Sequence, residues 1–222
     1  ITMNHWIDKV PGIIDVWYCA ITMNHWIDKV PGIIDVWYAG EAGGTAIADV
    51  LFGKYNPAGR LPITFPQHEG QLPLVYSHKP TGRGDDYVNL SGQPLFPFGY
   101  GLSYTSFSYD SLIISPKQNH HTFRVQFTLK NTGTTAGDEV VQLYLRDLVA
   151  SVSRPVTELK GFRRIHLLPG ESKNIEFEIT PRMLQMLDVH LNPVVQPGDF
   201  RIMIGASSKD IRLSETLHIY PD

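Results

Sequence analysis

Several features that would tie a chain to a particular environment are scarce in this sequence. Cysteine occurs once, as Cys19, so no disulfide can form within the chain. A lone cysteine fits either a reducing compartment or a bacterial periplasm. No apolar run approaches the roughly 20 residues that span a bilayer. Charged residues make up only 18% of the chain and are scattered, without a basic stripe that would attract phosphates. We therefore expect neither a membrane span nor a nucleic-acid partner.

What the sequence does contain suits a folded, turn-rich protein. Apolar residues make up 42% of the 222 residues, which is enough to bury a core. Glycine occurs 19 times and proline 16 times, as is typical of short strands joined by turns. The length allows one large domain or two small ones.

The first forty residues contain a duplication. Residues 1–18 recur without a change at 21–38, and all four tryptophans lie inside the two copies. Natural repeat architectures use several diverged copies, each carrying its own structural unit. Two identical copies instead favour an artefact of cloning or sequence assembly over a natural repeat. We therefore set residues 1–20 aside as a duplicated segment and take the second copy as native.

Residues 21–80 have the pattern of the C-terminal part of an α/β domain. The run from Gly32 to Tyr38 is apolar and rich in β-branched residues, as expected of a buried parallel strand. A loop of small residues leads to Thr45–Phe52, whose apolar spacing predicts a helix that Thr45 caps and Gly53 ends. Strand, glycine loop and helix form a βα unit, and such loops lie at the sheet edge where ligands bind.

The middle of the chain predicts a connecting segment. From Lys54 to about Pro97 the sequence is dense in Pro, Gly and Asn and has few periodic runs. This composition indicates a long, ordered stretch that wraps a surface. We place the interdomain linker itself at residues 81–106.

Residues 107–222 predict an all-β domain. Large apolar residues alternate with polar ones in Thr122–Lys130, and the pattern returns at 141–145, 175–179 and 200–204. Several short alternating strands with regular turns predict an antiparallel sandwich. Pro181–Leu187 predicts one short helix between the sheets, with proline in its first turn. The expected fold class is therefore an α/β fragment followed by an all-β immunoglobulin-like sandwich.

Five segments, each containing glycine, form short motifs along the chain. They are Leu51–Pro62 (LFGKYNPAGRLP), Pro97–Thr105 (PFGYGLSYT), Asn131–Gly133 (NTG), Ala136–Tyr144 (AGDEVVQLY) and Arg154–Phe162 (RPVTELKGF). In this order they resemble signatures of glycoside hydrolase family 3, of β-glucosidase type. In that family the first motif belongs to the second domain, the second motif follows it, and the rest belong to a fibronectin type III-like domain. The resemblance covers the chain from about residue 26 onward and identifies it as a C-terminal portion of such an enzyme.

The resemblance implies an activity whose catalytic groups we do not expect in this chain. Family members hydrolyse terminal β-linked sugars of oligosaccharides or glycosides with retention, using an aspartate nucleophile and a glutamate acid/base about 5 Å apart. In the family the nucleophile lies in an N-terminal barrel domain, and the acid/base lies well upstream of the segment around Glu41. We therefore expect no catalytic residue here, an inactive isolated chain, no cofactor, and the barrel domain as a partner. The family favours β-glucosidase activity and a periplasmic or secreted location, and it leaves a homodimer open.

Two loops hold the residues that we expect nearest to a substrate. Glu41, in the small-residue loop, can hydrogen-bond a sugar hydroxyl or support the acid/base. Its alternative role is a solvated charge beside a helix N-terminus. Arg83, Asp85, Asp86 and Tyr87 combine charge with an aromatic ring that can stack on a sugar, and their alternative is an exposed acidic loop.

No set of residues predicts a metal site, because the histidines lack a third ligand at a spacing that suits zinc. A different class of function stays open beside the hydrolase. The sandwich can be a non-catalytic module that associates with carbohydrate, supports the fold or pairs subunits. The two hypotheses differ in what they require, since only the hydrolase needs the barrel domain.

Overall fold

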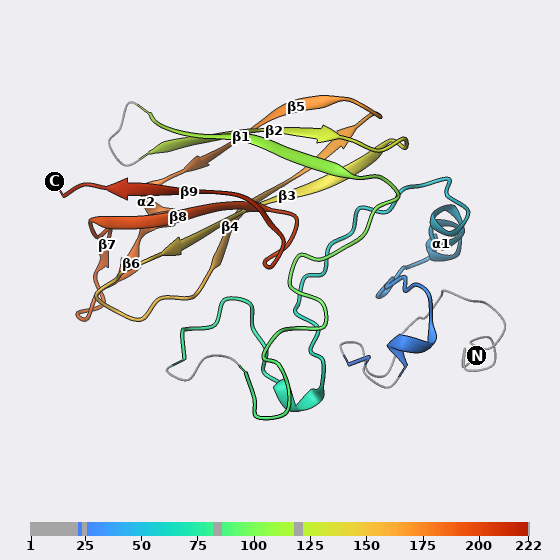
Figure 1. Ribbon diagram of the computed structural model, residues 1–222, viewed down its shortest axis with the longest axis horizontal. Coiled ribbons are helices and arrows are strands. Elements are labelled where there is room, and N and C mark those ends of the chain that lie inside the picture. Colours follow the sequence, from blue (N-terminus) through green and yellow to red (C-terminus); the bar gives the residue numbers. More distant parts are fainter. Residues whose placement is uncertain (1–21, 24–25, 82–85, 118–121, 222) are drawn as a thin grey trace.

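The computed structural model describes residues 22–23, 26–81, 86–117 and 122–221, so the duplicated segment 1–20 lies outside the described residues. Two parts follow each other along the chain (Figure 1). The first has little regular structure, and the second is a β-sandwich that begins at Phe107.

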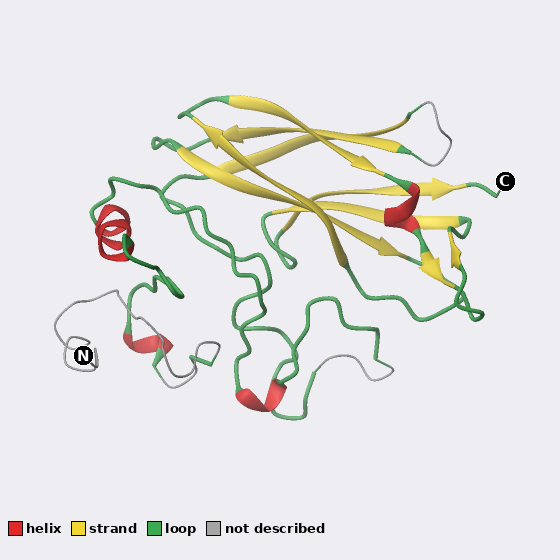
Figure 2. Cartoon of the chain, turned by 180° about the vertical axis from the view of Figure 1, so that it is seen from behind, coloured by secondary structure: helices red, strands yellow, loops and turns green. Residues whose placement is uncertain are grey.

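The sandwich consists of two antiparallel sheets (Figure 2, yellow). One sheet has the strand order β1-β2-β5, and the other has the order β4-β3-β8-β9. A short pair of strands, β6-β7, and the helix α2 complete this part. The bounds are β1 Phe107–Pro116, β2 Phe123–Asn131, β3 Gly137–Asp147, β4 Glu158–Leu167, β5 Ser172–Ile179, α2 Pro181–Leu184, β6 Met186–Leu187, β7 Pro193–Val194, β8 Gly198–Gly205 and β9 Ile211–Ile219.

The core lies between the two sheets and is built from the apolar residues that alternate in the sequence. On β2 every second side chain is buried, and β5 and β8 show the same alternation over most of their length. Each fully buried Val, Leu, Ile or Phe contributes about 1.5–3 kcal/mol relative to an exposed one. The predicted all-β immunoglobulin-like sandwich is confirmed. The buried core includes Phe123, Val125, Phe127, Leu129, Val141, Leu143, Leu145, Ile175, Phe177, Phe200, Ile202 and Ile204.

The N-terminal part differs from its prediction in two respects. The expected strand at Gly32–Tyr38 is wrong, because this run is irregular and its Trp37 and Tyr38 side chains are exposed. A parallel strand needs neighbours that accept its backbone hydrogen bonds, and no described strand lies beside it. The helix is present as α1 (Gly43–Leu51), but it starts earlier than expected, so Thr45 lies inside it and does not cap it. Gly53, with φ +72°, follows its end as predicted.

The helix expected at Pro181–Leu187 is shorter in the structure. It ends at Leu184 with proline in its first turn, and the next residues enter β6. Gln185 already has the extended backbone of a strand. The two leucines and two methionines of this stretch read equally well as helix or strand, so the local pattern could not place the boundary.

Between α1 and the sandwich the chain runs out and back as two adjacent arms (Figures 1 and 2). The arms exchange backbone hydrogen bonds, from Leu61 N to Tyr100 O at 2.8 Å and from Gly99 N to Leu61 O at 2.8 Å. Farther out, Phe65 and Phe96 form an isolated antiparallel bridge. We call residues 54–106 the linker segment. Short 3-10 helices occur at Ile27–Lys29 and, inside this segment, at Glu69–Gln71.

Among the described residues, no helix combines the length and apolar character needed to cross a membrane.

Candidate functional site

Glu41 lies in the exposed turn that leads into α1. Gly40 makes this turn possible because its φ is +68°, a value that glycine adopts without a steric penalty. The backbone N–H of Gly43 then donates to Gly40 O at 3.2 Å. A carboxylate so close to a helix N-terminus is favoured by the helix dipole. The position suits both a sugar-facing group and a simple surface charge.

The second candidate loop is closed by its own aspartate. Asp86 Oδ1 accepts hydrogen bonds from Gly92 N at 2.8 Å and from Ser91 Oγ at 3.3 Å. Tyr87 donates its backbone N–H to Leu90 O, and its ring is half exposed. Asp86 therefore shapes the loop, and Tyr87 keeps a ring face that can stack on a ligand. Arg83 and Asp85 lie outside the described residues.

The structure does not bring these two loops together. Figures 1 and 2 place α1 and the turn before it on one side, and the segment around residues 86–92 on another, with the arms of the linker segment between them. Among the described residues, no group of three or more His, Cys, Asp and Glu side chains could hold a metal ion. Among the described residues, Glu41 therefore does not share a site with Asp86 and Tyr87.

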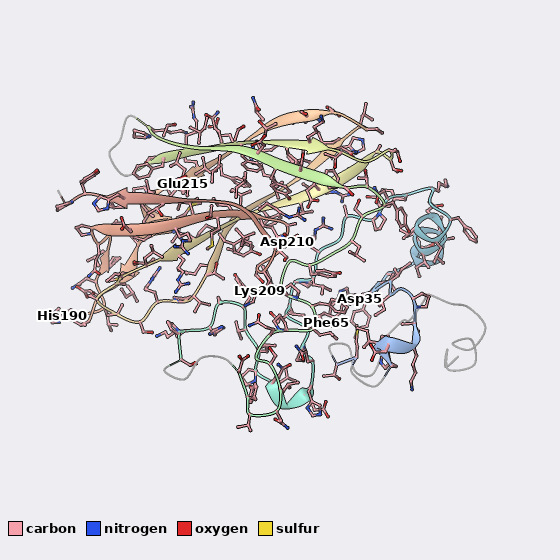
Figure 3. All side chains as sticks on the ribbon, in the orientation of Figure 1. Asp35, Phe65, His190, Lys209, Asp210 and Glu215 are labelled. Carbon is pink, nitrogen blue, oxygen red and sulfur yellow. The ribbon has the colours of Figure 1, made fainter. Side chains whose placement is uncertain are left out.

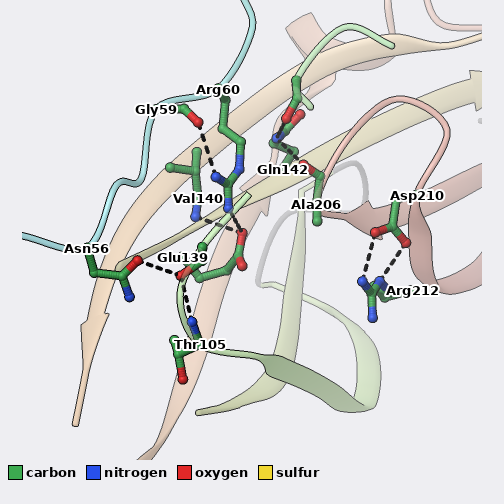
Figure 4. A network of polar contacts seen from close by, with 12 residues as sticks. Asn56, Gly59, Arg60, Thr105, Glu139, Val140, Gln142, Ala206, Asp210 and Arg212 are labelled. Atoms are coloured by element: carbon green, nitrogen blue, oxygen red, sulfur yellow. Dashed lines mark hydrogen bonds and ion pairs between the residues drawn. The ribbon is translucent and has the colours of Figure 1, made fainter. Parts of the chain in front are cut away.

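The motif residues converge instead on the junction between the linker segment and the sandwich (Figure 4). Arg60 donates from Nη2 to Glu139 Oε1 at 2.8 Å, and the two side chains are only 8% and 5% exposed. Arg60 Nη1 also donates to Gly59 O at 3.1 Å, and Glu139 Oε1 accepts from Val140 N at 2.9 Å. The ion pair joins a motif of the linker segment to β3.

Asn56 forms the second connection in this junction. Its Nδ2 donates to Ala136 O at 3.0 Å, just before β3. Its Oδ1 accepts from Ser103 Oγ at 3.0 Å and from Tyr104 N at 2.8 Å. The Tyr104 hydroxyl in turn donates to Val50 O at 2.8 Å and so holds the end of α1. One asparagine thus ties both arms of the linker segment to the sandwich.

Gln142 and a cluster of aromatic rings form the third connection. Gln142 Nε2 donates to Gly99 O at 3.1 Å and to Ala206 O at 2.7 Å, and its Oε1 accepts from the Tyr144 hydroxyl. Tyr76 stacks on Phe98 with ring centroids 4.1 Å apart and meets the Tyr144 ring edge-on at 6.2 Å. Tyr76 thus connects the Phe98 ring of the linker segment to the Tyr144 ring of the sandwich.

Two titratable groups beside the junction have displaced pKa values. Burial raises the pKa of the Tyr144 phenol, and the neighbouring Tyr76 adds to the effect. For Asp138, burial would raise the pKa, but hydrogen bonds from His166 and Arg164 outweigh it and hold the pKa below its ordinary value. Neither group is tuned toward neutral pH, where a general acid or base works best. The junction is therefore an arrangement for holding two parts together.

Sequence reasoning missed the roles of Arg60, Glu139 and Gln142. One signal was available, because Glu139 and Gln142 stand directly beside the apolar residues Val140, Val141 and Leu143 of β3. A polar side chain in such a strand is buried only if it finds a partner. The identity of the partners could not be read, since Arg60 and Glu139 are separated by 79 residues.

Two family models match the chain. The model of the glycosyl hydrolase family 3 C-terminal domain matches residues 18–104. The model of the fibronectin type III-like domain matches residues 139–208. Together they cover more than half of the chain, in the order in which the irregular part and the sandwich follow each other.

Similar proteins are found among curated sequences and among solved structures. The chain is 42% identical over 186 residues to a periplasmic beta-glucosidase of Salmonella typhimurium, covering 78% of this chain and 24% of that protein. It is 43% identical over 218 residues to a beta-xylosidase of Formosa agariphila, covering 94% of this chain and 27% of that protein. The structure of a beta-glucosidase from Listeria innocua in complex with glucose matches with a TM-score of 0.86 at 31% identity, covering 96% of this chain and 31% of that one. The chain thus spans about a quarter of the length of these curated relatives.

Proposed function

The chain belongs to glycoside hydrolase family 3, and on this premise we propose that it is the C-terminal part of a retaining, exo-acting β-glucosidase. The observation that carries the proposal is the similarity, at 31% identity and over 96% of the chain, to a structure whose name gives both the activity and bound glucose. The substrates would be oligosaccharides or glycosides with a terminal β-linked sugar. A relative named as a beta-xylosidase makes xylose the sugar that the test must distinguish from glucose.

In a retaining mechanism two carboxyl groups lie about 5–5.5 Å apart. One attacks the anomeric carbon and forms a covalent glycosyl-enzyme, while the other protonates the departing oxygen and later activates water. We place both groups in a part of the protein outside these 222 residues. By this proposal the isolated chain has no glycosidase activity.

For this chain we propose a contribution to the wall of the sugar site. Glu41 is exposed in a turn ordered by Gly40, so its carboxylate can accept hydrogen bonds from sugar hydroxyls presented by an adjoining domain. Tyr87 offers a half-exposed ring on a loop that Asp86 closes. The junction between the linker segment and the sandwich would fix the positions from which these groups act.

The activity is tested on the full-length protein that contains this chain. We expect turnover of para-nitrophenyl β-glucoside with a higher kcat/KM than for the β-xyloside, and a product that first appears as the β-anomer in NMR spectra. A first product in the α-anomeric form would rule out retention. Turnover by the 222-residue chain alone would refute the absence of the catalytic pair.

The role of Glu41 is tested by Glu41→Gln in the full-length protein. Loss of one charge-assisted hydrogen bond to a sugar hydroxyl should lower kcat/KM about tenfold. Glu69→Gln is the matched control, because Glu69 is also an exposed glutamate, at a short helix in the linker segment. Equal kcat/KM values for the two variants would remove Glu41 from the site.

A further inference from the structure

A polar pocket lies where the linker segment crosses the outer face of the four-stranded sheet. Its volume is about 220 Å³. The linker segment supplies one wall, and the other comes from β3, β8, the segment before β4 and the turn between β8 and β9, in which Figure 3 labels Lys209. The backbone N–H of Ser208 in that turn donates to Phe98 O at 2.9 Å and so ties the two walls together. The residues that carry the argument are Arg146, Thr157, Arg201, Ser208 and Lys209.

Two arginines lie side by side on the sheet wall of this pocket. Arg146 of β3 and Arg201 of β8 are direct partners in the antiparallel register. Their neighbours Leu145 and Ile202 are buried in the core, so strand alternation directs both arginines to the outer face. Like charges directly opposite on antiparallel strands destabilise a sheet. Lys209 brings a third positive charge to the same pocket.

The lining of the pocket contains no aspartate or glutamate among the described residues. Acidic residues near the lining residues in the chain have other partners: Glu158 pairs with Arg154, Asp210 with Arg212 and Asp199 with the imidazole of His218, while Asp147 interacts electrostatically with Arg154. Within the part of the chain that the structure describes, no ion pair therefore balances Arg146, Arg201 or Lys209. All three remain accessible to solvent, so a ligand can reach them.

Two hydroxyl groups at the pocket lack hydrogen-bond partners. Thr157 Oγ1 and Ser208 Oγ are buried, and neither bonds to any described residue. Buried polar atoms in folded proteins are nearly always satisfied, so two such atoms in one small pocket require an explanation. After a rotation about χ1, each hydroxyl can donate to a ligand oxygen. Uncompensated cations and unsatisfied donors thus occur in the same place.

We propose that this pocket binds a tetrahedral oxyanion, a phosphate or sulfate group. Arginine presents a planar fork of donors that matches the oxygen atoms of such a group, and charge-assisted bonds of this kind are the strong ones. Three cations without a counter-charge favour a ligand with more than one negative charge over a single carboxylate. The volume is below the ~300 Å³ at which pockets for drug-sized ligands begin, so it suits one charged group. The anion is either free in solution or an ester on a sugar.

Isothermal titration calorimetry on the 222-residue chain, at low ionic strength, tests the proposal. Inorganic phosphate, inorganic sulfate, a glucose phosphate ester and glucose are titrated separately. We expect saturable binding of the anions and none of glucose. Tighter binding of the ester than of inorganic phosphate would identify a phosphorylated sugar as the ligand, and equal binding would identify the free ion. No saturable binding of any of the anions would overturn the proposal.

Two variants separate a built site from general attraction by positive charge. Arg201→Gln should weaken anion binding about tenfold or more, because it removes a charge-assisted donor. Arg124→Gln removes the same charge from β2 in the other sheet, where Arg124 is exposed and pairs with Glu176 at 3.1 Å. We expect this control to bind within about twofold of the wild type, since exposed pairs contribute little. Equal losses in both variants would mean that the anion follows net charge only.

Thermal unfolding provides a second readout that a merely structural arginine would not give. In chloride, Arg201→Gln should keep or raise Tm, because it removes the unfavourable opposition to Arg146. Replacing chloride by phosphate should raise the Tm of the wild type more than the Tm of Arg201→Gln. Sulfate and phosphate stabilise proteins generally by exclusion, so the comparison with Arg124→Gln is essential. If Arg201→Gln does not fold, Lys209→Gln repeats the test, because Lys209 lies in a turn outside the strands. If phosphate raised the Tm of Lys209→Gln as much as that of the wild type, the proposal would be refuted.

Discussion

At the scale of single residues, the Arg60–Glu139 pair decides how firmly the linker segment is held. Both side chains are almost fully removed from water, and their nearest charged atoms are 2.8 Å apart. Taking two charges out of water costs about as much as their attraction returns, so the intact pair adds little net stability. Removal of one partner is different, because it leaves the other charge buried and uncompensated.

Glu139→Gln should therefore lower the free energy of unfolding by about 3 kcal/mol. The double variant Arg60→Met with Glu139→Leu should lose less, since it leaves no buried charge. Urea denaturation of the three proteins measures both values. A change in Glu139→Gln within about 0.5 kcal/mol of wild type, as for an ordinary surface position, would contradict the prediction.

Asp138 makes stability depend on pH in a defined direction. Burial works against its charge, but the hydrogen bonds from His166 and Arg164 prevail, so its folded pKa lies below the ordinary value of 3.8. A depressed folded pKa means that the carboxylate contributes stability above the ordinary value and loses it as pH falls through the folded value.

Asp138→Asn should accordingly be less stable than wild type at neutral pH, and the difference should shrink as pH falls below about 3.8. Free energies of unfolding from urea titrations at a series of pH values measure the difference. A gap that stays constant down to the lowest pH would show that the carboxylate charge plays no part.

At the scale of elements, the backbone at Gly99 links the returning arm of the linker segment to β3. Its φ is +81°, and a Cβ built there would lie 2.1 Å from Gln142 Oε1. Gly53 also has a positive φ, +72°, but a Cβ there would meet nothing within 4 Å. A comparison of alanine variants at the two glycines therefore separates the cost of backbone strain from the cost of a steric clash with Gln142.

Gly53→Ala should cost about 1 kcal/mol, from the left-handed backbone alone. Gly99→Ala should cost roughly 3 kcal/mol, because Gln142 must also move and give up its bonds to Gly99 O and Ala206 O. Chemical denaturation of both variants gives the comparison. Equal losses would mean that Gln142 yields without consequence.

The alternation of apolar and polar residues predicted best those strands that have a neighbouring strand on each side. β2, β3 and β8 are interior strands of their sheets, and their alternation was plain. Of the four edge strands, β5 was predicted because its last five residues alternate strictly between buried and more exposed positions. The other edge strands β1, β4 and β9 are more exposed, which relaxes the pattern, and they were not predicted. The apolar run at Gly32–Tyr38 reads as a strand because periodicity cannot detect whether partner strands are present.

The sequence predicted those parts of the candidate site that depend on residues close together in the chain. The exposed turn at Glu41 follows from its glycines, and the predicted loop at Asp86 and Tyr87 is present. The pocket between the linker segment and the sandwich could not be predicted, since Arg146 and Arg201 meet only through strand pairing. The proposed sugar-facing roles of Glu41 and Tyr87 stay predictions.

At the scale of the whole molecule, the linker segment belongs with the sandwich more than with the residues before it. Three connections hold it to β3 and to the residue just before β3, through Asn56, Arg60 and Gln142. The residues before it have few such ties. Around α1 the side chains of Tyr38, Leu51 and Phe52 are exposed.

Limited proteolysis should therefore cut first before about Lys54 and leave a resistant fragment of roughly 19 kDa, because cleavage follows regions of few contacts. Mass spectrometry of the digest identifies its first residue. Gly99→Ala should release the linker segment as well and shorten the fragment to the sandwich of roughly 13 kDa. Uniform resistance over the whole chain, or a first cut near Phe107 in wild type, would contradict this division.

The tryptophans divide along the same boundary. Trp26 and Trp37 lie before α1, and neither the linker segment nor the sandwich contains any. Tryptophan fluorescence is therefore an intrinsic optical signal of the N-terminal part alone, whereas far-ultraviolet circular dichroism is dominated by the sheets. If the two parts melt separately, the two signals give different midpoints. Tryptophan fluorescence can thus report when the N-terminal part separates from the rest of the protein, without an attached dye.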